Sequence, residues 1–285
     1  MREGKRGEIS LSNPNDLRAL NDWLAATFTN LDEKEYAEGL DEILDNPRFG
    51  RTREERVQNL HRAERIARVT NISGVVIALA FLFVDLNPYL SAALILYVPV
   101  TFFIVATSNG MIYFNNKTNS PHPYVTLGLF FVCFASLFRG VFDYHLLHYA
   151  PAFRNASILA AGLVLFMLGS TSEFAKRSSL DIANIFALLF MLLLFSFGVY
   201  TVSNGVFDTS RPQKFATTII GKQINEGSYS DSFTVKFIPA GPVTDDKADI
   251  SHSFYQSLEV NDTIRVCVKQ GLWGSQWFFV EDPGR

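Results

Sequence analysis

The stretch that decides the fold is Leu180–Val202, with the sequence LDIANIFALLFMLLLFSFGVYTV. From Ile185 to Tyr200 it carries no charge, and only Ala187, Ser196 and Gly198 interrupt the large apolar side chains. At about 1.5 Å per residue, a helix of this length crosses a hydrocarbon core of about 30 Å. Because it is apolar on every side, it has no face to turn toward water. It is also the last such segment, so its direction decides which side of a membrane the C-terminal region occupies.

The charges of the chain are strongly segregated. Residues 1–68 carry 26 of the 53 charged residues, and dense apolar sequence begins only at Val69 and continues to about Phe207. This distribution predicts a soluble, mainly helical N-terminal region (1–68), a transmembrane helical bundle (69–207) and a small C-terminal domain (208–285). The net charge of −3 is close to neutral, so no nucleic-acid partner is indicated.

Three short amphipathic helices are predicted in the N-terminal region. The first follows the capping sequence Asn13–Asp16, and the second ends near Asn46-Pro47. The third opens with Thr52 and Glu55, which have the spacing of a capping box. It runs on toward the membrane.

Five membrane-spanning helices are expected, so the predicted fold class is an α-helical integral membrane protein. Its predicted partners therefore include the lipid bilayer. Asp85–Pro88 reads as a tight turn that joins the first two spans in a hairpin. The predicted spans are residues 69–84, 89–107, 124–142, 156–172 and 180–202.

The orientation follows from the basic residues that flank the spans. With the N-terminus inside, the only basic residue of the short outer loops is Arg154, against nine on the inner side. Positive residues concentrate on the cytoplasmic side of membrane proteins. We therefore expect a cytoplasmic N-terminus and an extracytoplasmic C-terminus, and the loss of one span would reverse the second expectation. The nine inner residues are Arg51, Arg53, Arg56, Arg62, Arg65, Arg68, Lys117, Lys176 and Arg177.

From Arg211 onward the apolar residues alternate with polar ones, as in β-strands. About five short strands predict an all-β domain, either a barrel or a sandwich. The strand candidates are Phe215–Ile220, Phe233–Phe237, Phe254–Leu258, Ile264–Val268 and Trp277–Val280.

Ionisable residues gather at the outer end of the third span. Arg139 and Asp143 are four residues apart on one helix face and are expected to pair, and Asp85 is expected to reach the same leaflet. His145 and His148 follow directly, and Asp143 with these two histidines supplies acceptable ligands for a divalent metal. The alternative is structural: a snorkelling arginine neutralised by an aspartate, with histidines at the interface.

In the C-terminal domain, Trp273 lies in the Gly271–Gly274 turn and Trp277 follows it. These side chains either form a binding patch or complete the barrel core. No nucleophile motif accompanies the domain's histidine, His252, and nothing in the sequence implies a cofactor.

The combination of helices and a terminal β-domain is similar to a group of uncharacterised bacterial inner-membrane proteins, whose β-domain ends in a Gly-rich hairpin. The resemblance covers Tyr255–Val280, particularly Asp262–Val266 and Gly271–Trp277. It implies a bacterial inner membrane as the location and no known activity.

Three functions remain open. The leading hypothesis is a non-enzymatic interaction or scaffold protein whose β-domain binds an envelope protein. The second is a channel or transporter for a neutral or lipidic solute, and the third is a metal-dependent membrane enzyme. The channel hypothesis rests on small polar residues within the spans: Asn71, Ser73, Thr101, Ser136, Asn184 and Ser196.

Overall fold

The computed structural model describes residues 18, 20, 31–84, 87–115, 119–170, 179–225 and 232–281, with backbone only at 31, 170 and 179–185. The predicted first soluble helix therefore lies outside the described residues, except at two positions. The predicted second helix is α2 (Leu31–Asp45), and Asn46 caps the short 3-10 helix η1 (Pro47–Phe49) that follows.

The predicted third soluble helix and the predicted first span form one continuous helix, α3 (Arg53–Phe83). Thr52 caps it by accepting a hydrogen bond from the Glu55 amide at 3.2 Å, while the Glu55 carboxylate accepts from Arg51. The boundary at Val69 is therefore a change of charge and not of backbone. No glycine or proline precedes Gly74 in this helix, so nothing in the sequence ends it at residue 68.

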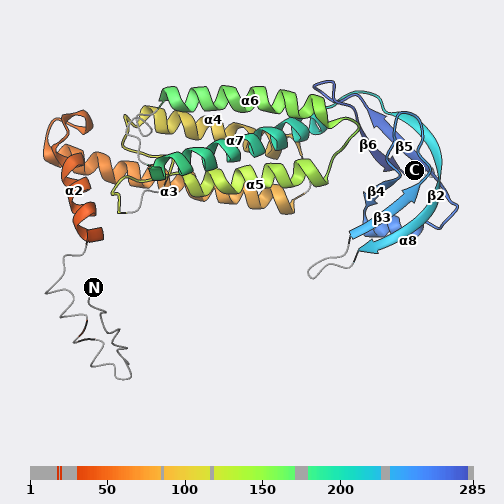
Figure 1. Ribbon diagram of the computed structural model, residues 1–285, viewed down its shortest axis with the longest axis horizontal. Helices are drawn as coiled ribbons and strands as arrows, with labels where there is room; N and C mark the ends of the chain where they lie inside the picture. Colours follow the sequence, from red (N-terminus) through yellow and green to blue (C-terminus); the bar gives the residue numbers. More distant parts are fainter. Residues whose placement is uncertain are drawn as a thin grey trace, which may run out of the picture.

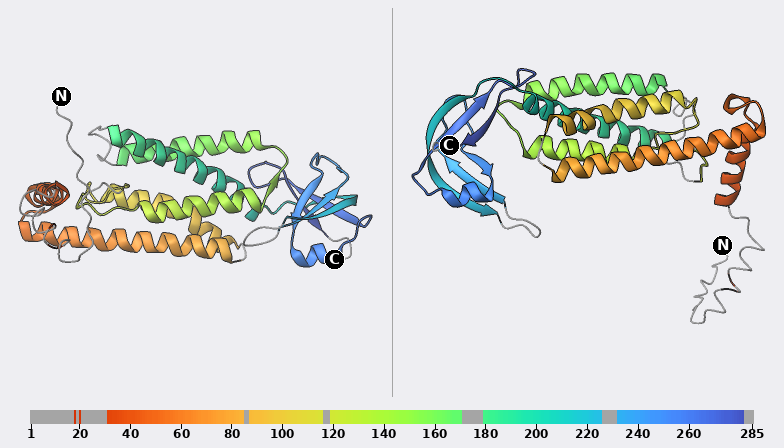
Figure 2. Two further views of the ribbon diagram at one scale, coloured as in Figure 1. Left: turned by 60° about the horizontal axis from the view of Figure 1, so that its bottom comes forward. Right: turned by 180° about the vertical axis from the view of Figure 1, so that it is seen from behind.

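Four further helices lie beside α3, and each helix runs antiparallel to the one before it in the chain (Figures 1 and 2). They are α4 (Pro88–Thr107), α5 (Thr126–Phe142), α6 (Tyr149–Ser170) and α7 (Ser179–Val206). Among the described residues, α3, α4, α6 and α7 are long and apolar enough to cross a membrane. α5 is also apolar but has only 17 residues. The five predicted spans thus correspond to four candidate spans and one shorter helix.

Small residues allow α5 to lie close to its neighbours. A Cβ atom added at Gly198 of α7 would lie 2.3 Å from the carbonyl carbon of Ser136 in α5. On the other side, a Cβ atom at Gly128 would lie 2.0 Å from the Tyr97 hydroxyl, which donates to the Thr70 carbonyl of α3. Close backbone approach through small residues is typical of helix packing in membranes.

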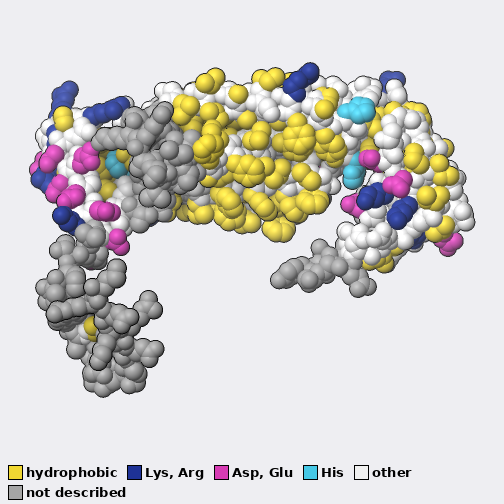
Figure 3. All heavy atoms as spheres, in the orientation of Figure 1, with side chains coloured by type: hydrophobic (Ala, Val, Ile, Leu, Met, Phe, Trp, Pro, Cys, Tyr) yellow, Lys and Arg dark blue, Asp and Glu magenta, His cyan; other side chains and the backbone are white. Residues whose placement is uncertain are grey.

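The surface of the bundle is divided along its length (Figure 3). Hydrophobic side chains cover the middle, and charged side chains gather mostly at the two ends. One of these ends carries α2 and the other carries the β-domain (Figures 1 and 2).

The β-domain is an antiparallel sheet with the order β1-β6-β5-β2-β3-β4. Four predicted strands are present, and β4 approaches β6, which nearly closes the sheet. The long strand β2 pairs with β5 along its first half and with β3 along its second, with a bulge between Ile219 and Gly221. The strands are β1 (His145–Leu146), β2 (Gln213–Asn225), β3 (Ser232–Phe237), β4 (Lys247–Ile250), β5 (Thr263–Lys269) and β6 (Trp277–Glu281).

Two features of this domain differ from expectation. The predicted strand Phe254–Leu258 is wrong: these residues belong mainly to the helix α8 (His252–Ser257), because the Ser251 side chain caps it by accepting from the Phe254 amide. In addition, β1 comes from the connection between α5 and α6 and pairs with β6. The β-sheet is therefore completed by a strand from within the bundle, outside the predicted 208–285 domain.

Candidate functional site

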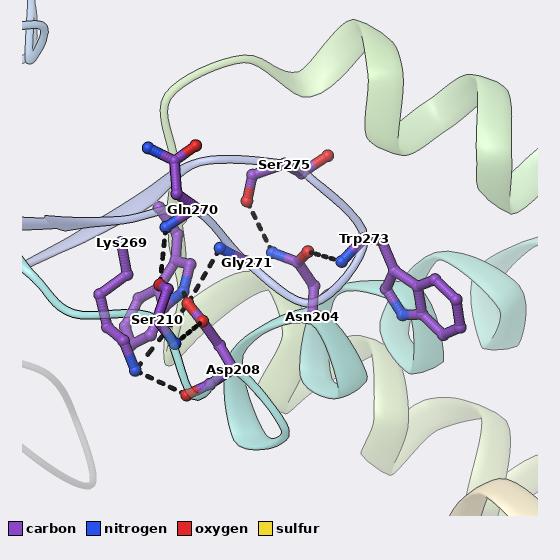
Figure 4. Close-up of polar contacts among 9 residues, drawn as sticks. Asn204, Asp208, Ser210, Lys269, Gln270, Gly271, Trp273 and Ser275 are labelled. Atoms are coloured by element: carbon purple, nitrogen blue, oxygen red, sulfur yellow. Dashed lines mark hydrogen bonds and ion pairs between the residues drawn. The ribbon is translucent and has the colours of Figure 1, made fainter.

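The turn between β5 and β6 is fastened to the end of α7 by the fully buried Asn204 (Figure 4). The Asn204 Nδ2 donates to the Ser275 carbonyl at 2.7 Å, and its Oδ1 accepts from the Trp273 amide at 3.0 Å. The Asn204 carbonyl accepts from the Leu272 amide at 2.9 Å. Gly271 has φ +76° and lies so close that an added Cβ would be 2.4 Å from the Asn204 amide, so glycine is required here.

Asp208 forms a second attachment just after α7 (Figure 4). Its side chain is 2% exposed and accepts hydrogen bonds from the Gly271 amide and the Trp277 indole, both at 2.9 Å, and from the Ser210 amide at 2.8 Å. Lys269 donates to the Asp208 carbonyl and lies 3.8 Å from the carboxylate. Burial alone would raise the pKa of Asp208, but these hydrogen bonds outweigh it and hold the pKa below its ordinary value. The carboxylate therefore stays charged at neutral pH.

The connection between α5 and α6 supplies the third attachment. Through β1, Leu146 is paired with Trp277, and the Tyr144 ring meets the Trp277 ring edge-on with centroids 5.3 Å apart. From α7, the Tyr200 hydroxyl lies 2.8 Å from the Ser275 hydroxyl. The β-domain is thus held by several segments at once, in one orientation.

Arg139 pairs with Asp143 as predicted, with a distance of 2.7 Å between the guanidinium and the carboxylate. The guanidinium also donates to two backbone carbonyls at the end of α3, Phe81 at 2.9 Å and Val84 at 2.7 Å. Terminal carbonyls of a helix lack intrahelical partners, and cations are favourable there. Arg139 therefore joins the ends of α5 and α3. Asp85, predicted in the same leaflet, lies outside the described residues.

The structure does not bring Asp143, His145 and His148 together as a metal site. Among the residues it describes, no group of three or more His, Cys, Asp or Glu side chains is placed to hold a metal ion. Asp143 is engaged by Arg139, and the His145 ring stacks on Phe278 with centroids 5.2 Å apart. Burial lowers the pKa of His145. Arg139 neutralises Asp143, as in the structural alternative, while His145 packs against the β-domain.

The two tryptophans named by the sequence do not form one patch. The Trp277 indole is half-buried and donates to Asp208, while Trp273 is 57% exposed and donates through its indole to the Ser203 hydroxyl.

Cys267 is buried, and burial together with the neighbouring Glu281 raises the pKa of its thiol to about 11. Such a thiol is protonated and unreactive at neutral pH.

Small polar residues inside the bundle are mostly used by the bundle itself. Asn71 donates to the Tyr124 carbonyl and accepts from the Gly128 amide. Ser73 and Ser136 each donate to a backbone carbonyl three residues earlier. Ser196 is buried, and its hydroxyl has no hydrogen-bond partner in the described part of the chain. The side chain of Asn184 lies outside the described part of the chain.

Two hollows lie at the end of the bundle that carries α2. The first, of about 600 Å³, lies beside α3 and the segment that precedes α5. The second, of about 540 Å³, lies between η1, α3 and the end of α4.

Sequence reasoning missed Asn204, Asp208 and Ser275, whose contacts join residues about 70 positions apart. The only sequence signal is a pair of polar residues at the end of an otherwise apolar span.

No family model, curated protein or solved structure matches the chain. Its function must therefore be inferred from its own residues.

Proposed function

We propose that this protein is a non-enzymatic membrane protein that holds its β-domain in a fixed orientation outside the cytoplasm, where the domain binds an envelope protein. The observation that carries the proposal is the junction. Buried Asn204 and Asp208, together with β1, attach the domain to the bundle at the end opposite α2. A free-moving domain on a linker needs no such contacts.

The exposed surface of the helices supports membrane insertion. Large apolar side chains are exposed along α3, α5 and α6, for example Ile72, Phe134 and Leu165. Large contiguous patches of exposed apolar surface mark sites of contact with a membrane or with another protein. With 17 residues, α5 spans about 25 Å, the short end of what crosses a bilayer.

Five crossings are consistent with the opposite placement of α2 and the β-domain (Figure 1). Together with the nine-to-one bias of basic residues, this supports a cytoplasmic N-terminus and an extracytoplasmic C-terminus in a bacterial inner membrane.

The connectivity of β2–β6, with α8 between β4 and β5, resembles the OB-fold, a partly open five-stranded Greek-key barrel. Barrels of this kind host many functions, so the likeness names no ligand.

The candidate contact surface is an apolar patch formed by Ile220, Ile238 and Val260. Each of these side chains is about half exposed. The Ile238 amide bonds to the Thr218 carbonyl, and the Asn261 amide bonds to the Ile219 carbonyl. Ile238 and Val260 therefore flank β2 on its two sides, next to Ile220.

The test uses the full-length protein in intact cells, because the sheet includes a strand from the bundle. A photo-crosslinking residue replaces Ile220 in one variant and the exposed Lys236 in a control. We expect an adduct with one envelope protein at position 220, and its loss when Ile238→Asp is added. Adducts of equal yield at positions 220 and 236, or none at either, would contradict the proposed binding surface.

A further inference from the structure

The 600 Å³ hollow at the α2 end of the bundle changes from polar to apolar along α3. Glu64 and Arg68 lie on its wall, followed along the same helix by Ile72 and Val76. From Arg68 to Val76 the helix advances by about 12 Å. Within this distance the wall passes from charged groups to side chains that are more than half exposed and purely apolar.

Two charged groups on this wall have capacity for a ligand. Arg68 makes no hydrogen bond or ion pair with another residue in the described part of the chain, although Glu64 lies one turn away on the same helix. Among the described residues, Glu64 makes one polar contact, with the His61 ring at 3.3 Å. By contrast, the Asn71 side-chain amide is already engaged, because it donates to the Tyr124 carbonyl and accepts from the Gly128 amide. An arginine guanidinium suits a phosphate, and a carboxylate suits an ammonium group.

The apolar end of the hollow continues onto the outer surface of the bundle. Ile72, Val76 and Leu127 line it and are each at least half exposed. An occupant therefore needs a phosphate, an amine about one helical turn away, and a hydrocarbon chain that leaves along α3. These features belong together in one class of molecule, the amine-bearing glycerophospholipid.

We propose that this hollow binds one phospholipid with an ethanolamine head group. Arg68 holds the phosphate, Glu64 faces the ammonium group, and Ile72, Val76 and Leu127 contact an acyl chain. This inference rests on the membrane insertion in the proposed function, but not on the envelope partner or on the side reached by the C-terminus.

The experiment measures lipids retained by the purified full-length protein, using native mass spectrometry after incubation with equal amounts of phosphatidylethanolamine and phosphatidylglycerol. For the wild type we expect one retained lipid, with phosphatidylethanolamine preferred. Arg68→Gln should lower retention of both lipids about tenfold, since a charge-assisted bond is lost. Glu64→Gln should keep the retention and abolish the preference. Arg65→Gln, on the same helix but outside the hollow, is the matched control.

A second variant, Ile72→Trp, fills the apolar end without changing any charge and should also reduce retention. This variant tests the site independently, in case the Arg68→Gln protein fails to fold. Equal retention by Arg68→Gln and Arg65→Gln, or a preference that survives Glu64→Gln, would overturn the inference. Wild-type protein that partitions into membranes yet retains no lipid would refute this site alone, whereas protein that stays out of membranes would refute the proposed function.

Discussion

The side-chain amide of Asn204, in the last turn of α7, donates a 2.7 Å hydrogen bond to the backbone carbonyl of Ser275 in the β-domain. Both groups are buried, and the other end of the same amide accepts from Trp273. One side chain thus satisfies two backbone groups of a turn that is 71 residues away in the sequence.

Replacing Asn204 by leucine should destabilise the junction. The Ser275 carbonyl and the Trp273 amide would lose their partner, at a cost of about 2–4 kcal/mol in the free energy of unfolding. The measurement is denaturant unfolding of the purified protein in detergent, combined with limited proteolysis of the β-domain. Gln276→Ala is the control, because among the described residues that side chain makes one hydrogen bond, of 3.3 Å, to Gln270. Equal losses in both variants would show that the Asn204 contacts have no special weight.

Asp208 should make the junction sensitive to acid. Its pKa is lower in the folded protein than in the unfolded chain, so its stabilising contribution is complete above the ordinary aspartate pKa of about 3.9. That contribution is lost as the pH falls below this value and the carboxylate is protonated.

The check compares unfolding of the wild type and Asp208→Asn between pH 7 and pH 3. The variant should be about 1–3 kcal/mol less stable at pH 7, and the difference should shrink toward pH 3. A difference that does not change with pH would contradict the assigned role of the carboxylate.

The close crossing of α5 and α7 depends on Gly198. Alanine at this position would bring a Cβ atom within 2.3 Å of the Ser136 backbone, which must shift, so we expect a loss of at least about 2 kcal/mol. Gly162→Ala in α6 is the matched control, since no atom lies within 4 Å of its added Cβ. That control should be neutral or stabilising by up to about 1 kcal/mol. Thermal unfolding in one detergent compares the two variants, and similar behaviour of both would disprove the predicted crossing.

Trp273 should lie at the membrane interface. Its indole bonds to Ser203 and its amide to Asn204, both within the candidate span of α7, and the ring is 57% exposed. Interfacial tryptophans are common in membrane proteins. In vesicles of lipids brominated near the head group, the quenchable fluorescence of the wild type should exceed that of Trp273→Phe. Unchanged quenching in the variant would place the turn away from the lipid.

The helices could be predicted from the sequence because their apolar runs are long and their ends are marked by charges or by caps such as Thr52 and Asn87. The region boundary expected at residue 68 lies within one continuous helix, since a change from charged to apolar residues does not end a helix. Four of the strands were predicted from alternation or from short runs of apolar residues between turn signals. The strand expected around Phe254 was wrong because a short run of five residues, three of them apolar, does not reveal the local cap supplied by Ser251.

The junction could not be predicted in the same way. β1 has two residues, too few for any periodic pattern, and it pairs with a strand more than 130 residues later. The pairing of Arg139 with Asp143 followed from their helical spacing and is confirmed, whereas the contact of Arg139 with the end of α3 depends on tertiary packing. Asn204 and Asp208 looked like ordinary polar residues at the end of a span.

Reporter fusions in bacterial cells can show whether the bundle crosses the membrane five times and holds the β-domain outside. Alkaline phosphatase, active only outside the cytoplasm, and a fluorescent protein, bright only inside, are each fused after Arg285 and between Lys176 and Ser178. After Arg285 we expect active phosphatase and no fluorescence. Between Lys176 and Ser178 we expect fluorescence and inactive phosphatase. Fluorescence and inactive phosphatase after Arg285 would contradict it.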